Sequence, residues 1–211
     1  MMVISNFLFD LYLFAGCAWC YSGFWLYFAR ATAAIFLAIV GISLTLSYSR
    51  DSHFSKFLKR GLRIFAYGLI LTAVTFIFLG ENAVLFGILH LIGASIILSY
   101  PFIERKGLAL AGGLVLIGLG FFIRLPSQFF WLANSPGYSS VDYNPILPWF
   151  GIVLIGIFLG RILYPESKPK LSLRDNILSK IGRKSLLIYL AHQPVILALL
   201  SLYFGRLPLQ I

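Results

Sequence analysis

The run LPWFGIVLIGIFLGRILY, residues 147–164, carries a single charged residue, Arg161. A helix needs about 20 mostly apolar residues to cross the hydrocarbon core of a membrane. Lipid offers no partner to backbone N–H and C=O groups, so such a run is predicted to be a membrane-spanning helix. Six further runs have the same character and are predicted to span at 1–18, 29–48, 61–79, 84–103, 107–123 and 186–204.

Composition supports this interpretation for the whole chain. Of the 211 residues, 60% are hydrophobic and 11% are charged, whereas a soluble domain is about 25% charged. The mean hydropathy is +0.91, and a soluble protein this apolar lacks the polar residues to cover its surface. The two cysteines are too few for a disulfide scaffold. We therefore predict one all-α polytopic membrane domain, residues 1–211, with about seven transmembrane helices.

The basic residues indicate how the chain is oriented. Residues 50–63, 105–106 and 161–184 hold 5, 2 and 7 of the 17 lysines and arginines. Alternating spans place these three segments on one side, and short cytoplasmic loops are the ones enriched in Lys and Arg. The prediction is a multi-pass protein of the cell membrane with a cytoplasmic N-terminus. The formal charge of +10 then reflects topology, so membrane lipid and not nucleic acid is the expected partner.

Several local patterns refine this organisation. The outer segment 124–146 is rich in turn residues and aromatics, and is either functional or a connector with interfacial anchors. Residues 165–184 are predicted to hold an amphipathic surface helix. Spans 84–103 and 107–123 are predicted to form a tight antiparallel hairpin. Gly156 and Gly160 form a GxxxG pattern, which is typical of a helix-packing face.

Ionisable residues inside predicted spans are functional candidates by default, because such groups are costly in lipid. Arg30 has the alternative of snorkelling to the outer headgroups, and Arg161 that of a cytoplasmic anchor. Asp10 has the alternative of pairing with Arg30 or with a histidine. His90 has the alternative of an interhelical hydrogen bond, and His192 that of a hydrogen bond at the kink expected from Pro194. No nucleotide-binding loop or hydrolase motif appears in the sequence.

The tetrapeptide Cys17-Ala18-Trp19-Cys20 lies at the end of the first predicted span. A structural zinc site needs four ligands, and no second cysteine pair exists. Apolar filler is the favoured interpretation, with a redox pair as the alternative.

Five segments carry a resemblance to a known family. They are MVISNFLFDL (2–11), VGISLTL (40–46), FGILHLI (86–92), DYNPILPWFG (142–151) and IGRKSLLIYLAHQP (181–194). Together they resemble the prokaryotic branch of the heparan-alpha-glucosaminide N-acetyltransferase catalytic-domain family of multispanning membrane acyltransferases.

The resemblance implies an enzyme that moves an acetyl group from cytosolic acetyl-CoA, used as co-substrate, to an amino or hydroxyl group of a sugar or cell-envelope glycan outside. The sequence departs from the family in two ways. Family members usually carry a charged Asp-x-x-Arg-Gly-like stretch before the segment 2–10, and with the sequence starting at Met1 either that piece is missing or the chosen start is late. Many prokaryotic relatives have His at the position of Asn6, whereas the lysosomal enzyme has Asn there. The lysosomal enzyme also has a catalytic histidine after its first helix, and residues 17–29 contain none.

Acyl transfer needs a base and donors for the developing oxyanion. We expect His90 to be the base, with Asn6 as donor and either Asp10 or Asp142 orienting the imidazole. His192 is the alternative base. Arg50, Lys56, Lys59 and Arg60 are expected to hold the CoA phosphates.

The same sequence leaves other possibilities open. No metal is expected, and a homodimer is considered beside the monomer. The alternative functions are a proton-coupled transporter or flippase-like carrier, and a noncatalytic membrane subunit. An acyltransferase requires its polar groups to converge, and this requirement separates it from the alternatives.

Overall fold

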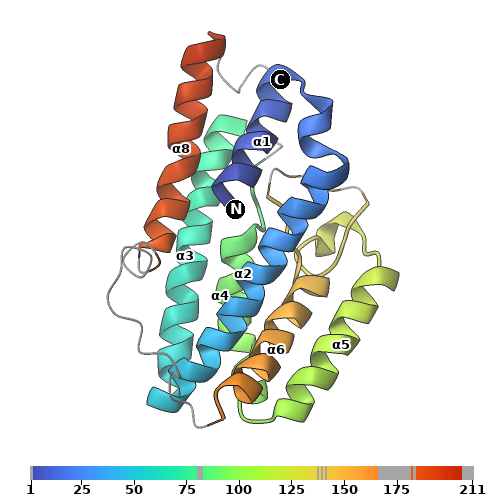
Figure 1. Cartoon of the computed structure of the whole chain (residues 1–211), viewed down its shortest axis with the longest axis vertical. Coiled ribbons are helices and arrows are strands. Elements are labelled where there is room, and N and C mark those ends of the chain that lie inside the picture. The colour runs from blue at the N-terminus through green and yellow to red at the C-terminus, as the bar shows by residue number, and fades with distance from the viewer. Residues whose placement is uncertain are drawn as a thin grey trace. The chain divides into compact units, whose positions relative to one another are not determined.

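The computed structural model describes residues 2–79, 83–136, 138, 140, 142–165, 182 and 184–205. Every regular element in these residues is a helix (Figure 1). The helices are α1 (Met2–Ala15), η1 (Ala18–Tyr21), α2 (Gly23–Arg50), α3 (Phe54–Leu79), α4 (Ile88–Leu98), η3 (Tyr100–Phe102), α5 (Lys106–Phe122), η4 (Ser127–Phe129), α6 (Ile146–Leu163) and α8 (Ser185–Phe204).

Each predicted span overlaps one of the seven α-helices of the described residues, so the all-α class is confirmed. Helices α2, α3 and α6 are long and apolar enough to cross a membrane, while α1, α4 and α5 are shorter apolar helices. The count of seven spans and the cytoplasmic N-terminus stay predictions. The surface helix predicted over 165–184 falls almost entirely outside the described residues.

The fourth helix is shorter than its predicted span of 84–103. It begins at Ile88 because Gly87 is extended, with φ −95° and ψ −173°. The first helical N–H group, that of Ile88, donates to Asp142 at 2.9 Å. At the other end α4 stops at Leu98, and the short helix η3 with Pro101 follows.

The chain divides into two compact units, which are described separately. The first contains the residues up to Ala33 and helix α8. The second runs from Ala34 through the end of α6.

In the second unit α4 packs against α3, and α5 packs against α6 (Figure 1). The predicted hairpin between the fourth and fifth spans is therefore wrong, although the turn between them is short. Glycines explain these pairings, because they let backbones touch. A Cβ on Gly93 of α4 would lie 2.7 Å from the Phe65 nitrogen of α3. One on Gly151 of α6 would lie 2.7 Å from the Gly113 oxygen of α5.

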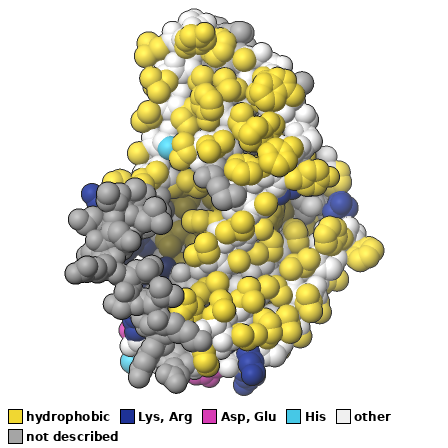
Figure 2. Space-filling view, in the orientation of Figure 1, with side chains coloured by type: hydrophobic (Ala, Val, Ile, Leu, Met, Phe, Trp, Pro, Cys, Tyr) yellow, Lys and Arg dark blue, Asp and Glu magenta, His cyan; other side chains and the backbone are white. Residues whose placement is uncertain are grey.

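The GxxxG pattern of α6 forms a packing face, as predicted, and the helix packed against it is α2. A Cβ on Gly156 would overlap the Ala38 backbone, and one on Gly160 would lie 2.5 Å from Thr45 Oγ1. The outer surfaces of these helices are apolar. Phe122 of α5 is 86% exposed and Ile77 of α3 is 75% exposed, and apolar side chains dominate the visible face in Figure 2. A surface of this kind suits lipid and not water.

In the first unit α1 and α8 run parallel. Asn6 lies opposite His192, and further along Leu11 packs against Ile196 and Leu200. His192, Ile196 and Leu200 follow one another at intervals of four residues, so they share one face of α8. This face buries a small apolar cluster directly beside a polar pair.

Candidate active site

The predicted catalytic residues fall into two groups. Asn6, Asp10 and His192 belong to the first unit, and His90 and Asp142 belong to the second. Each group brings together residues that are distant in the sequence.

The contact between Asn6 and His192 joins helices from opposite ends of the chain. Asn6 Nδ2 lies 2.6 Å from His192 Nε2, across a separation of 186 residues. His192 is 9% exposed, and its ring packs near Tyr189 with centroids 5.6 Å apart. The imidazole is thus held in place within the described part of the first unit.

The second ring nitrogen of His192 decides the tautomer. Nδ1 lies 2.6 Å from the Tyr189 carbonyl oxygen and 3.2 Å from that of Ile188. Carbonyl oxygens only accept hydrogen bonds, so Nδ1 carries the proton. In the neutral ring Nε2 then has a free lone pair, which accepts the Asn6 amide N–H. This is the arrangement of a general base with a fixed orientation.

Asp10 follows Asn6 by one turn of α1 and is 1% exposed. Residues four apart lie on the same helix face, with Cβ atoms about 5–6 Å apart. The first unit therefore combines a carboxyl, an amide and an imidazole along the polar side of α1 and α8.

His90 lies in the second unit and is 1% exposed. Its Nδ1 accepts the Gly87 N–H at 3.2 Å, and its Nε2 lies 3.4 Å from Thr72 Oγ1. The Thr72 hydroxyl donates to the Val84 oxygen at 2.6 Å, so it accepts from the ring. The ring also stands edge-on to Phe65 at 5.1 Å. The contact with Gly87 closes the N-terminal turn of α4, and the contact with Thr72 of α3 is an interhelical hydrogen bond of the kind given above as the alternative role of His90.

Asp142, in the segment 124–146, binds the same turn. Its Oδ2 accepts the Ile88 N–H at 2.9 Å, and its Oδ1 accepts from Asn144 Nδ2 at 2.5 Å. The Asn144 N–H donates to the Phe86 oxygen at 3.2 Å. A carboxylate at a helix N-terminus is stabilised by the helix dipole and by exposed N–H groups. His90 and Asp142 thus meet around Gly87, and both hold the start of α4.

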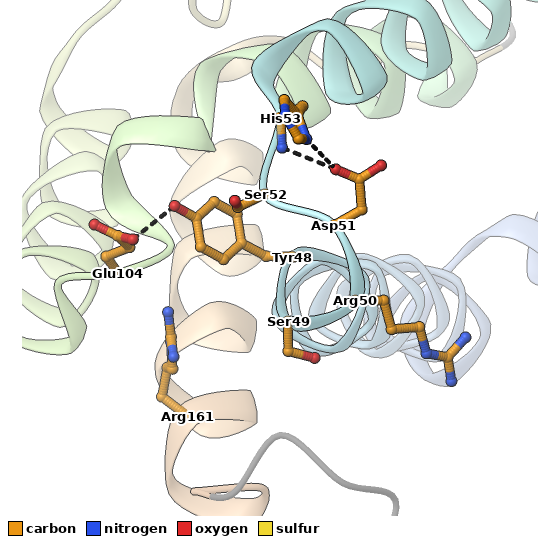
Figure 3. Close-up of a pocket in the computed structure, with 8 residues that line it drawn as sticks. All are labelled: Tyr48, Ser49, Arg50, Asp51, Ser52, His53, Glu104 and Arg161. Carbon is orange, nitrogen blue, oxygen red and sulfur yellow. Dashed lines mark hydrogen bonds and ion pairs between the residues drawn. The ribbon is translucent and has the colours of Figure 1, made fainter.

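An open depression of about 700 Å³ lies at one end of the second unit, where α2 passes into α3 (Figure 3). Arg161 reaches it from α6, and its Nε donates to the Ile103 oxygen at 2.7 Å. Tyr48 donates to Glu104 at 2.6 Å across the depression. The full lining is Tyr48, Ser49, Arg50, Asp51, Ser52, His53, Glu104 and Arg161.

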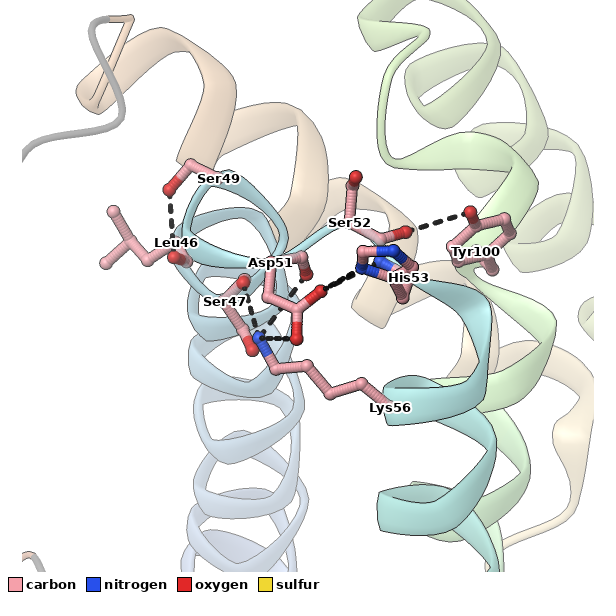
Figure 4. A network of polar contacts seen from close by, with 8 residues as sticks. All are labelled: Leu46, Ser47, Ser49, Asp51, Ser52, His53, Lys56 and Tyr100. Atoms are coloured by element: carbon pink, nitrogen blue, oxygen red, sulfur yellow. Dashed lines mark hydrogen bonds and ion pairs between the residues drawn. The ribbon is translucent and has the colours of Figure 1, made fainter.

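Of the four residues expected to hold CoA phosphates, Arg50 lines this depression. Lys56 is engaged nearby, with Nζ 3.0 Å from the Ser47 oxygen and 3.8 Å from Asp51 Oδ2 (Figure 4). Lys59 and Arg60 are exposed on α3. Sequence reasoning missed Arg161 as a lining residue, because its position was also that of an ordinary cytoplasmic anchor.

Hydrogen bonds from His53 in the α2–α3 turn favour the ionised form of Asp51. The His53 backbone N–H donates to Asp51 at 3.0 Å and the ring Nδ1 lies at 2.8 Å. These contacts hold the pKa of the Asp51 carboxyl below its usual range. The carboxylate stays ionised at neutral pH and helps to anchor the turn.

The two cysteines form a disulfide, Cys17–Cys20. The favoured interpretation as apolar filler is therefore wrong. Local sequence does not settle the pairing, because a C-x-x-C turn is equally compatible with free thiols.

Among the described residues, no three side chains of His, Cys, Asp or Glu gather as a metal site would require. The expectation that no metal takes part stays a prediction.

One comparison with known proteins finds a match. The family model described as heparan-alpha-glucosaminide N-acetyltransferase, catalytic, matches residues 1–194. This range includes both groups of candidate residues, and it confirms the resemblance drawn from the five segments. No curated protein and no solved structure matches the chain.

Proposed function

The chain belongs to the heparan-alpha-glucosaminide N-acetyltransferase catalytic family, a family of membrane acetyltransferases, and from this membership we propose that it acetylates a sugar or cell-envelope glycan with acetyl-CoA. The observation that carries the proposal is the Asn6–His192 pair. It supplies an oriented base and an amide donor at 2.6 Å.

The chemistry follows from these two side chains. The lone pair of the acceptor amine or hydroxyl attacks the carbonyl carbon of the thioester. As this bond forms, the acceptor's proton passes to His192 Nε2, at the position now taken by the Asn6 amide. The displaced Asn6 amide donates to the resulting oxyanion. Collapse of the intermediate expels the CoA thiolate, which takes the proton from His192, and the base is restored.

The nucleotide end of acetyl-CoA is proposed to bind at the depression of the second unit. Arg50 and Arg161 offer guanidinium groups, which pair with phosphate in a planar fork. The two carboxylates of the lining are already engaged, Glu104 by Tyr48 and Asp51 by His53.

The proposed topology has this depression facing the cytoplasm of the cell. In the second unit the depression draws on the predicted cytoplasmic segments around residues 50–53, 104 and 161. In the first unit the disulfide follows α1, at the end predicted to lie outside. Disulfides persist in oxidising compartments, which supports this orientation.

The decisive experiment is an acetyl-transfer assay. The full chain is purified in detergent and given radiolabelled acetyl-CoA with an amino sugar. His192→Ala should lower the rate by about 10²–10⁴-fold, the usual loss when a general base is removed. Tyr203→Phe, an exposed position on the same helix, serves as the control. Turnover within about tenfold of the parent in His192→Ala would remove this residue from the proton transfer.

A binding titration tests the donor site separately. Arg161→Gln should weaken CoA binding, and the difference should shrink at high salt because salt screens exposed charges. Lys106→Gln, at an exposed position outside the lining, is the matched control. Equal affinity in the Arg161→Gln and parent chains would exclude the depression as the phosphate site.

A further inference from the structure

The Cys17–Cys20 disulfide encloses too few residues to contribute mainly to the stability of the fold. A disulfide stabilises a fold chiefly by restricting the unfolded chain, and the effect grows with the length of chain enclosed. Only Ala18 and Trp19 lie between Cys17 and Cys20. The turn is also held by its own backbone, since the Cys20 N–H donates to the Cys17 oxygen at 3.0 Å.

The two cysteine residues differ in exposure. Cys20 is 1% exposed, whereas Cys17 is partly exposed. Trp19 between them is 66% exposed, so the turn presents itself at the surface of the unit. Thiol–disulfide exchange begins with attack on an accessible sulfur, and C-x-x-C spacing provides a neighbour that leaves and later resolves the bond.

The turn is coupled to the helix that carries Asn6. Gly16, with φ +64°, is the single residue between α1 and Cys17, and Gly23, with φ +50°, follows the turn. These left-handed conformations favour glycine and set the path of the chain on both sides. Helix η1, which contains Cys20 and begins directly after Cys17, packs against α1.

We propose that Cys17–Cys20 is a redox-active pair, reduced through Cys17 by a dithiol protein, and that its redox state controls how η1 holds α1. A donor thiolate attacks Cys17 Sγ, the Cys17–Cys20 bond breaks, and Cys20 leaves as a thiolate that takes a proton. The second donor thiol then attacks the mixed disulfide and releases Cys17. Two electrons and two protons pass to the pair, and the donor becomes a disulfide. The effect on catalysis rests on the proposed function.

The exchange is tested with single-cysteine variants and oxidised glutathione. Cys20→Ser, which keeps the accessible Cys17, should form a mixed disulfide that mass spectrometry detects. Cys17→Ser, the matched control with the buried Cys20, should form several-fold less. Equal adducts in the two variants, or none in Cys20→Ser, would overturn the proposal. In the unmodified chain, brief dithiothreitol treatment followed by alkylation should mark Cys17 first, which excludes misfolding of a variant as the cause.

The control of α1 is tested by acetyl transfer before and after reduction. The parent rate should change on reduction, while that of the Cys17→Ser/Cys20→Ser chain should not. An acetyl-transfer rate of the parent chain that is the same before and after reduction would overturn the proposed control of α1. Failure of the oxidised chain to transfer acetyl groups at all would instead refute the proposed function, and the adduct result would still decide the exchange.

Discussion

His90 illustrates how a single buried side chain can organise a helix start. Both of its nitrogens have partners, the Gly87 N–H and the Thr72 hydroxyl. Asn at this position retains an acceptor for Gly87, whereas Ala leaves that N–H unpaired, at a cost of about 1–3 kcal/mol. We expect His90→Ala to unfold at lower temperature than His90→Asn in a detergent melting assay.

The same pair of variants separates capping from catalysis. An amide cannot replace an imidazole as a base, so a general-base role predicts a rate loss on the order of 10²–10⁴ in His90→Asn with stability kept. That result would restore His90 as the base. Near-normal transfer in a stable His90→Asn chain would assign it to the architecture of α4.

Tyr143 is the corresponding anchor of the outer segment. Its hydroxyl lies 2.8 Å from the Phe130 oxygen and 2.9 Å from the Ala133 oxygen. Burial raises the pKa of Tyr143 above its ordinary value of 10.0, so the fold favours the protonated phenol. This contribution to stability is complete below pH 10 and is lost as the pH rises through the folded-state pKa.

Tyr143→Phe should therefore unfold more easily at neutral pH, by about 1 kcal/mol, and should lose less additional stability between neutral and alkaline pH. Denaturation midpoints measured across this range give the comparison. Parallel alkaline profiles for both chains would show that the phenol does not titrate with unfolding.

Among the helices, α5 offers a test of glycine packing. A Cβ on Gly120 would lie 2.6 Å from Pro148 Cβ and 2.9 Å from its Cα, and a proline ring cannot move aside easily. Overpacking of this kind costs about 1–3 kcal/mol. Gly120→Ala should lower the melting temperature. Gly118→Ala on the same helix meets nothing within 4 Å and should be neutral or stabilising. Equal effects would mean that helix propensity, and not packing, governs α5.

Helix positions were predictable from sequence because apolar length alone identifies them. The run at 147–164 differs from α6 by one residue at each end. The start of α4 was not predictable, because Asp142 caps it from 54 residues further on. Pairings between helices escaped prediction for the same reason. The hairpin between the fourth and fifth spans looked natural from a three-residue turn, yet backbone contacts at Gly93 and Gly151 select other partners.

For the molecule as a whole, the prediction with most consequences is which side of the membrane each loop faces. Ser52 lines the depression, and Ser127 is exposed in the segment 124–146, which is predicted to lie outside. In a Cys17→Ser/Cys20→Ser background, a membrane-impermeant maleimide applied to intact cells should label Ser127→Cys and spare Ser52→Cys. Permeabilised cells should label both. Labelling of Ser52→Cys alone in intact cells would reverse the orientation.

The candidate site was predictable as a set of residue types but not as an arrangement. Asn6 and His192 were both candidates from the sequence, yet neither carries a local signal of the other. His90 ranked first because glycines flank it, and in the fold Gly87 uses that space to meet Asp142 and the ring. Long-range contacts decide between such candidates, and they arise only when the helices assemble.

The separation of Asn6 and His192 also has a consequence for biosynthesis. Ribosomes add roughly 5–20 residues per second, so the 186 residues between the two side chains take roughly 10–40 s to translate. During this interval α1 is already available for insertion, while Asn6 has no His192 to meet. A nascent chain therefore has to shelter Asn6 and Asp10 within the insertion machinery or against other helices until translation reaches His192. Messages that end before that codon would yield a chain that lacks the proposed base, His192.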